Sequence, residues 1–195
     1  LNILADNLKK EAKTAMQLAK QKGILLLPSN TIGYSKIKKR KSPRYNKKEL
    51  VLGTKNRELE LHLCGTHIHV DKQKDIVKQH TMMTALDPLF SLMSTTPFFN
   101  GENHINDYRV KVYREEVFEN MPDYGRLLPY INSKEELKNR HKKLFIEWKK
   151  KCEELKVDTE GFTLLNTCWG PVRLSKKTIE SRNSDANTVS NVLAL

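Results

Sequence analysis

The chain has 195 residues, of which 38% are hydrophobic and 30% are charged, and its formal net charge is +12. This length is enough for a sizeable hydrophobic core, and we expect a single domain over residues 1–195. No apolar run is long enough to cross a bilayer, which excludes a protein anchored by membrane-spanning helices and predicts no membrane partner.

The start of the chain and its cysteines indicate a cytoplasmic protein. The first residues lack the basic and apolar regions of a secretory signal. The chain also begins without Met, and we expect it to start inside a larger protein. Cys64, Cys152 and Cys168 have neither zinc-site spacing nor a disulfide framework, which favours reduced thiols in the cytoplasm.

The excess positive charge is concentrated in two stretches, residues 36–48 and 142–151. Neither stretch is interleaved with exposed aromatic residues, so we interpret both as solvated surface and predict no nucleic-acid partner. Positive charge is still compatible with small anionic ligands, including nucleotide phosphates.

The first part of the chain predicts a helix, a buried strand and a long connection. Apolar residues recur at helical spacing over residues 1–22, and Gly23 follows where a left-handed C-cap is expected. Residues 24–27, Ile-Leu-Leu-Leu, are typical of a short strand buried on both faces. The polar and basic composition that follows predicts a long basic loop over residues 31–57.

The apolar pattern then changes phase. Over residues 59–63 the apolar residues occupy odd positions, which predicts a half-buried strand, whereas over residues 68–70 they occupy even positions. A β-bulge near Gly65 would absorb the extra residue and keep the apolar side chains on the core. His67 and His69 would then point away from the core.

The rest of the chain alternates long helices with few strands. Helical spacing predicts a helix over residues 72–95, kinked or divided by Pro88, and another over residues 133–155, opened by a capping box of Ser133 and Glu136. The other expected elements are short helical and irregular pieces over residues 105–130, strands over residues 162–168 and 177–183, and a final helix from residue 186 that Asp185 caps. We therefore predict an α+β fold with helices on one face of a sheet.

Two short patterns carry chemistry. His67 and His69 lie two residues apart on a predicted strand, so both imidazoles face the same side of a sheet. Glu180 and Arg182 repeat this spacing on another predicted strand. Imidazoles and a carboxylate can bind a divalent metal, and arginine adds fork-shaped donors for phosphate, which together suit phosphoryl transfer. Each pattern alone also occurs in structural strands and ordinary ion pairs.

Several motifs in the same order resemble the family-two glutamate-cysteine ligases, also described as carboxylate-amine ligases. They are residues 64–70, residues 94–103 with Tyr108 and Arg109, residues 169–173 and residues 178–182, and residues 43–45 match a further piece. The resemblance covers nearly the whole chain. It implies a fold similar to the catalytic domain of glutamine synthetase, in which helices lie behind an antiparallel sheet with an open active-site face.

The resemblance also implies an activity. ATP phosphorylates the side-chain carboxylate of glutamate, and the amine of cysteine or of another small molecule displaces the phosphate. Carried over by position, His67 and Glu180 would hold Mg²⁺, and His69 would lie near the phosphates of ATP. Arg182 would bind and stabilise the transferred phosphoryl group.

Two further arginines complete the site that the resemblance implies. Arg109 would bind a substrate carboxylate or phosphate, and Arg173 is a further candidate for the ATP cleft. Proteins of this family open with a glutamate-rich strand that supplies more metal ligands, and no such strand precedes Leu1 here. We therefore expect a truncated catalytic domain, with self-association into a homo-oligomer left open.

Two alternatives to the ligase are kept. One is a catalytically silent binding or structural domain, which the missing glutamate-rich strand favours. The other is a metal-dependent hydrolase built on His67 and His69. ATP binding separates the first alternative from the ligase, and strict ATP dependence of turnover separates the second.

Overall fold

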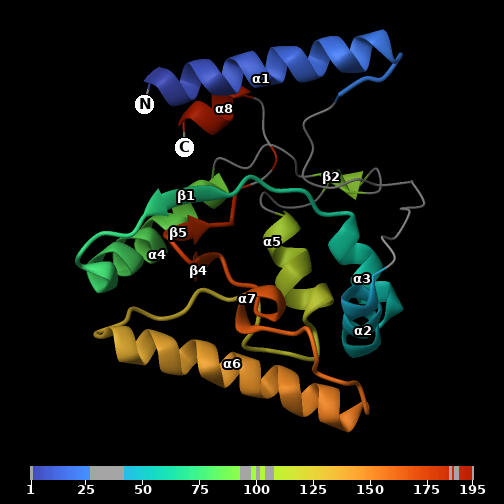
Figure 1. Cartoon of the computed structure of the whole chain (residues 1–195), viewed down its shortest axis with the longest axis vertical. Coiled ribbons are helices and arrows are strands. Elements are labelled where there is room, and N and C mark those ends of the chain that lie inside the picture. Colours follow the sequence, from blue (N-terminus) through green and yellow to red (C-terminus); the bar gives the residue numbers. More distant parts are fainter. Residues whose placement is uncertain are drawn as a thin grey trace.

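The computed structural model of the chain describes residues 2–26, 42–92, 98–99, 102–103, 108–184, 186 and 189–194. Helices surround a small antiparallel sheet, which confirms the α+β class (Figure 1). The strand order is β1-β5-β4, with β1 at Ile68–Asp71, β5 at Thr178–Ser181 and β4 at Val172–Leu174. The strands that carry the two chemical patterns are therefore neighbours, as the pairing of β1 with β5 shows.

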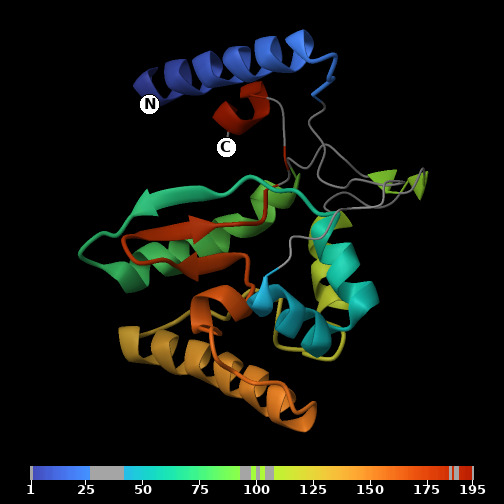
Figure 2. The same cartoon turned by 45° about the vertical axis from the view of Figure 1, so that its right-hand side comes forward.

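The two faces of this sheet carry different side chains. Ile179 of β5 and Val172 of β4 are buried and pack with Ile76 of helix α4 (Ile76–Leu92). Because side chains alternate along a strand, Glu180 points to the opposite face. Helix α4 thus covers one face of the sheet (Figure 2), and the polar residues His69, Glu180 and Arg173, which are paired in register, lie on the other face.

Helix α4 is shorter than the helix predicted over residues 72–95. It starts beyond Asp75, whose Oδ1 accepts a hydrogen bond at 3.0 Å from the backbone N–H three residues further on. This contact is typical of an N-cap. Pro88 lies inside the helix, which continues past it to Leu92 and is not divided. Residues 93–95 lie outside the described part of the chain.

His80 of α4 makes the stability of the fold depend on pH. Its side chain is buried, and burial together with the charges of His141 and Arg140 lowers its pKa from 6.5 to about 4. Between these pH values the unfolded chain binds a proton that the folded chain does not. The free energy of unfolding therefore falls as the pH is lowered from about 6.5 to 4. Replacing His80 by leucine should flatten this part of the pH profile in urea unfolding.

Thr84→Val is the matched control for His80. It removes a hydroxyl that lies 3.4 Å from His80 Nδ1 and keeps the imidazole. In this control, the free energy of unfolding should depend on pH as steeply as it does in the wild type. The same slope in His80→Leu would show that this histidine is not the titrating group.

Helix α6 (Lys134–Glu154) begins as the sequence predicts. Ser133 Oγ accepts a hydrogen bond from the backbone N–H of Glu136 at 3.0 Å. The Glu136 carboxylate reaches back to the backbone N–H of Asn132 at 2.8 Å, one residue before the partner of a standard capping box. Of the predicted buried stripe of Leu137, Leu144, Phe145, Trp148 and Cys152, all are buried except Phe145, which is partly buried against the same core.

Replacing Ser133 by alanine should lower the free energy of unfolding by about 1 kcal/mol, because the first turn of α6 loses a side-chain acceptor. Ser42→Ala is the control. Ser42 occupies the N-cap position of another helix, but its side chain makes no capping hydrogen bond. Equal losses of stability in urea titrations of the two variants would contradict this account of the cap.

A larger aromatic core is formed by residues of α6, of the segment 108–124 and of the segment around Trp169. Helix α5 (Tyr108–Val112) continues into a π-helix, η1 (Tyr113–Val117), within residues 105–130, for which the sequence predicts short helical and irregular pieces. The Tyr113 ring stacks on Trp169, with centroids 4.2 Å and planes 10° apart. Trp148 of α6 is fully buried in the same core. This packing fixes Trp169 close to the start of strand β4, with Gly170 and Pro171 between them.

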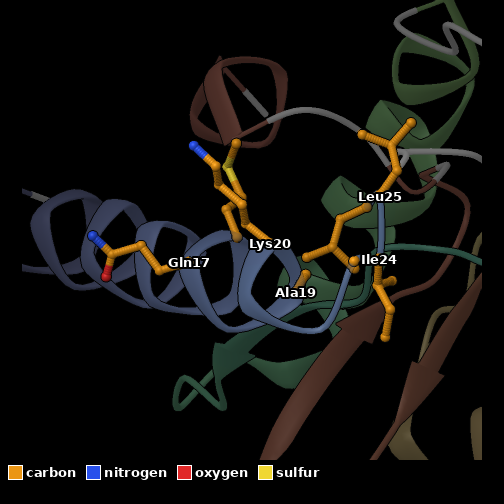
Figure 3. A pocket seen from close by; sticks show the side chains of 8 residues that line it. Gln17, Ala19, Lys20, Ile24 and Leu25 are labelled. Carbon is orange, nitrogen blue, oxygen red and sulfur yellow. The ribbon is translucent and has the colours of Figure 1, made fainter.

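The predicted buried strand at residues 24–27 is not formed. Helix α1 (Asn2–Gln21) ends as expected, with Gly23 at a φ of 66°. Residues 24–26 have no regular structure and are exposed, and residue 27 lies outside the described residues. Leu25, at 79% exposure, lines an apolar pocket of about 450 Å³ at the end of α1 (Figure 3). The helices in the described ranges include none that is both long and apolar enough to span a membrane.

The predicted basic loop over residues 31–57 and the predicted strand over residues 59–63 are also corrected. Residues of both segments form helices, α2 (Pro43–Leu52) and α3 (Thr54–Leu61), while residues 31–41 lie outside the described residues. Proline at the first helical position, after an extended Ser42, is a favourable helix start. Since residues 59–61 are helical, the phase change marks the end of a helix, and no bulge is needed to explain it.

The last part of the chain matches its prediction in one strand. Strand β5 lies within the predicted strand of residues 177–183. Residues 164–167, within the predicted strand of residues 162–168, instead form the short helix α7 (Leu164–Thr167). A final helix, α8 (Val189–Ala194), is present, and Asp185, its predicted cap, lies outside the described residues.

Candidate functional site

Glu180 is the centre of the polar cluster on the face of the sheet opposite α4. Its side chain is almost fully buried. Arg173 lies opposite it in the register of β4 and β5 and donates to Glu180 Oε2 from Nη2 at 2.6 Å and from Nε at 3.0 Å. One carboxylate oxygen is therefore occupied by Arg173, and the other faces the histidines.

The two histidines lie on the face that the sequence predicts. His67 Nδ1 is 3.0 Å from Glu180 Oε1, and His69 Nε2 is 3.9 Å from the same oxygen. His69 pairs with Glu180 in the register of β1 and β5, and its Nδ1 lies 2.9 Å from Thr178 Oγ1. The structure thus brings His67, His69 and Glu180 together, with both imidazoles partly exposed.

Glu180 is held as a carboxylate. Burial alone would raise its pKa, but hydrogen bonds from His67 and Arg173 and the charge of Arg182 outweigh burial and lower the pKa from 4.5 to about 2. The group is therefore ionised throughout the neutral range. An ionised carboxylate on this face can accept hydrogen bonds or bind a cation.

Arg182 joins the cluster from beyond the end of β5. Its Nε lies 3.2 Å from Glu180 Oε1, without the alignment of a hydrogen bond, and its guanidinium lies 5.7 Å from the Trp169 ring centroid. Burial and repulsion from Arg173 lower the Arg182 pKa to about 10. Arg182 is still charged at neutral pH, but Glu180 does not fully neutralise the arginines around it.

Arg109 lies behind Arg182. It is only 2% exposed, and its Nη1 donates a hydrogen bond at 2.8 Å to the backbone carbonyl of Arg182. Its guanidinium lies 5.3 Å from the Tyr113 ring centroid and 5.9 Å from that of Trp169. The expected direct contact between Arg109 and a substrate does not fit this buried position, from which Arg109 contacts Arg182 instead.

A basic pocket of about 360 Å³ opens beside the cluster. Helices α2 and α3 form one wall of this pocket, and Trp169 and its neighbours form another. The charged residues that line it are Arg44, Lys48, Arg57, Arg173, Arg182 and Glu60. Five basic residues against one acidic residue favour a small anionic ligand.

The interpretation of residues 31–57 as a solvated loop leaves Lys48 and Arg57 out of the site predicted from the sequence. Both pair with Glu60, and the Arg57 Nη1 to Glu60 Oε2 distance is 2.6 Å. Burial lowers the pKa of Lys48 even though Glu60 raises it. The signal was present in the sequence, since Ser42 before a proline starts a helix, and Arg44 and Lys48 then lie on one helical face.

The donor atoms of the cluster limit the kind of Mg²⁺ site that it can form. Within the described residues, no group of three or more His, Cys, Asp or Glu side chains is placed to hold a metal ion. A Mg²⁺ ion that arrives with a nucleotide commonly uses only one or two protein carboxylates and keeps several waters. Glu180 could supply the one carboxylate of such a site, although its Oε1 already contacts His67 and Arg182 and its Oε2 accepts from Arg173, whereas a zinc hydrolase centre needs three protein ligands placed around the ion.

Comparisons of the chain with protein-family models, with curated proteins and with solved structures found no match. The function is therefore inferred from the geometry of this cluster and from the sequence motifs.

One predicted motif is not placed at the cluster. From the segment of residues 94–103, the structure describes only β2 (Phe98–Phe99) and β3 (Glu102–Asn103), which pair with each other. In Figure 1 strand β2 lies on the side of the molecule away from β4 and β5. The other residues of the motif lie outside the described part of the chain.

Proposed function

We propose that the chain is part of an ATP- and Mg²⁺-dependent carboxylate-amine ligase of the glutamate-cysteine ligase type. The observation that carries this proposal is the arrangement of Glu180 between Arg173, Arg182 and two histidines, beside a basic pocket. The sequence motifs support the same family. They also support a catalytic fold like that of glutamine synthetase, of which the described sheet would be a part.

The charge balance of the cluster favours a phosphate ligand. Besides burial, Arg173 and Arg109 both lower the pKa of Arg182 by repulsion, and Glu180, which pairs with Arg173 and Arg182, is the only carboxylate among the described residues that raises it. The three guanidinium groups thus carry more positive charge than this one carboxylate neutralises. The phosphates of ATP would supply the missing negative charge, and planar guanidinium groups suit phosphate oxygens.

Each group then has a distinct task in phosphoryl transfer. Arg182 faces the pocket and stabilises the negative charge that develops on the transferred group. Arg173 holds the Glu180 carboxylate in place, and His69 lies at the exposed edge near the expected phosphates. Mg²⁺, held by Glu180 and His67, would neutralise phosphate charge when bound.

The reaction proceeds in two balanced steps. An oxygen of the glutamate side-chain carboxylate attacks the γ-phosphorus of ATP, which forms an acyl phosphate and releases ADP. The amine nitrogen of cysteine or of another small molecule then attacks the acyl carbon, which forms an amide, releases inorganic phosphate and gives up a proton to solvent. We expect this activity in the cytoplasm, with no nucleic acid or membrane involved and with homo-oligomers compatible with it.

The direct test is ATP turnover. Purified protein is incubated with Mg²⁺, ATP, glutamate and each member of a panel of amines, and ADP release is measured. The proposal predicts ADP release that requires glutamate and increases with the correct amine. No glutamate-dependent ADP release with any amine would contradict it. Hydrolysis that requires zinc and no ATP would instead support the metal-dependent hydrolase.

A further inference from the structure

We propose that Gly65 and Arg109 are positioning residues for Arg182. Glycine at position 65 leaves room for the Arg109 guanidinium, and this guanidinium holds the backbone of Arg182 in place. The proposal rests on the proposed function, because it concerns the arginine that is assigned to the transferred phosphoryl group. It gives a role to two residues of separate sequence motifs that do not themselves line the basic pocket.

The first observation is the lack of space at Gly65. A Cβ atom on this residue would lie 2.4 Å from Cζ, 2.5 Å from Nη2 and 2.8 Å from Nε of Arg109. Optimal contacts between carbon atoms are about 3.5–4.0 Å, so these positions overlap. Gly65 does not have a positive φ, in contrast to Gly23, Gly53, Gly125 and Gly161. Glycine is therefore needed here for space and not for its backbone conformation.

The second observation is the way Arg182 is held. Arg109 donates to the Arg182 carbonyl at 2.8 Å, and the Arg182 N–H donates to the Pro171 carbonyl at 2.8 Å. The guanidinium groups of both arginines lie within 6 Å of the Trp169 ring centroid, which is the range of cation–π contacts. Arg109 thus ties the backbone of Arg182 to the aromatic core below the site.

These two observations predict an effect on ligand binding that exceeds the effect on stability. The atoms that a Cβ at position 65 would meet belong to the end of a flexible side chain and not to the backbone. The fold can therefore accept the extra methyl group when the Arg109 guanidinium moves. That movement removes the hydrogen bond to the Arg182 carbonyl, and Arg182 loses its fixed position.

The test is a double-mutant cycle that measures MgATP affinity by calorimetry. Gly65→Ala and Arg109→Met should each weaken binding by about tenfold, because each removes the same contact. The double variant should be no more than about twofold weaker than either single variant, since residues that act through one contact are not additive. Independent effects would multiply to about a hundredfold and would overturn the proposal, as would wild-type affinity in Gly65→Ala.

Gly170→Ala is the matched control. Gly170 lies next to Trp169, but the nearest atoms to a Cβ at this position are 3.9 and 4.0 Å away. This variant should bind MgATP within about twofold of the wild type. A tenfold loss in Gly170→Ala would show that any added methyl group near the site weakens binding, and would overturn the specific role of Gly65.

A second readout separates this proposal from the proposed function. The ¹⁵N relaxation of the Arg182 side-chain Nε–H, measured without ligand, reports how firmly Arg182 is held. Gly65→Ala should increase its mobility, whereas Gly170→Ala should not. If the wild type binds no MgATP, the proposed function fails while this measurement still decides the positioning role. Unchanged Arg182 mobility in Gly65→Ala would overturn that role.

Discussion

Glu180→Gln is expected to lower the free energy of unfolding by about 3 kcal/mol, because removal of one partner leaves buried charges uncompensated. Arg173 and Arg182 both depend on this carboxylate for charge compensation. Glutamine has a similar size, so the loss would reflect charge and not a cavity. Urea unfolding at pH 7, with the midpoint and slope compared with those of the wild type, measures the effect.

Glu135→Gln is the control for this substitution. Glu135 forms an exposed ion pair of 3.8 Å with Lys138, and such pairs contribute at most about 1 kcal/mol and often nothing measurable. Similar losses in the two variants would contradict the special position of Glu180.

The pH dependence of unfolding gives a second measure of Glu180. Its pKa is about 2 in the folded chain and has an ordinary value of 4.5. A depressed pKa stabilises the fold fully above about pH 4.5, and this stabilisation is lost as the pH falls through about 2. Glu180→Gln should therefore show a weaker loss of stability over this interval than the wild type.

Arg182→Lys is expected to lower the rate of glutamate-dependent ADP release by at least about 100-fold. A lysine keeps the positive charge but loses the planar fork that matches phosphate oxygens, and loss of one transition-state donor commonly costs this much. The effect should fall mainly on kcat, because Arg182 is assigned to charge that develops during transfer. Steady-state kinetics with varied ATP separate kcat from KM.

Arg140→Lys is the matched control for Arg182→Lys. Arg140 lies on α6, and its guanidinium donates to the backbone carbonyls of Pro129 and Tyr130. It does not line the basic pocket. Its replacement should leave kcat within about twofold of the wild type. A small effect of Arg182→Lys, or equal losses in both variants, would remove Arg182 from the transfer step.

The face on which the site lies could be predicted from the sequence. His69 lies in β1 and Glu180 in β5, and the residues two positions away, His67 and Arg182, lie just beyond these strands but still contact Glu180, as the spacing predicts. The capping of α6 by Ser133 could also be predicted from the sequence, because it depends on a contact between residues only three positions apart. Local geometry fixed these features.

The predictions that the structure corrects concern features that depend on long-range packing. The Ile-Leu-Leu-Leu run at residues 24–27 has strand-like composition, but no described strand pairs with it and its described residues are exposed. Arginine often binds anionic ligands, which makes Arg109 a reasonable candidate from the sequence. Its burial beneath Arg182, however, depends on the packing of α5 against the segment at Gly65. The spacing of residues within one segment does not show which other segment will pack against it.

The most direct test of the central claim is calorimetric titration of the chain with ATP, with and without Mg²⁺, and of Arg182→Lys in parallel. The proposal predicts saturable binding to the wild type that weakens when Mg²⁺ is omitted and when Arg182 is replaced. No binding to the wild type, or equal affinity in wild type and Arg182→Lys, would contradict it. The first of these results would favour a catalytically silent domain.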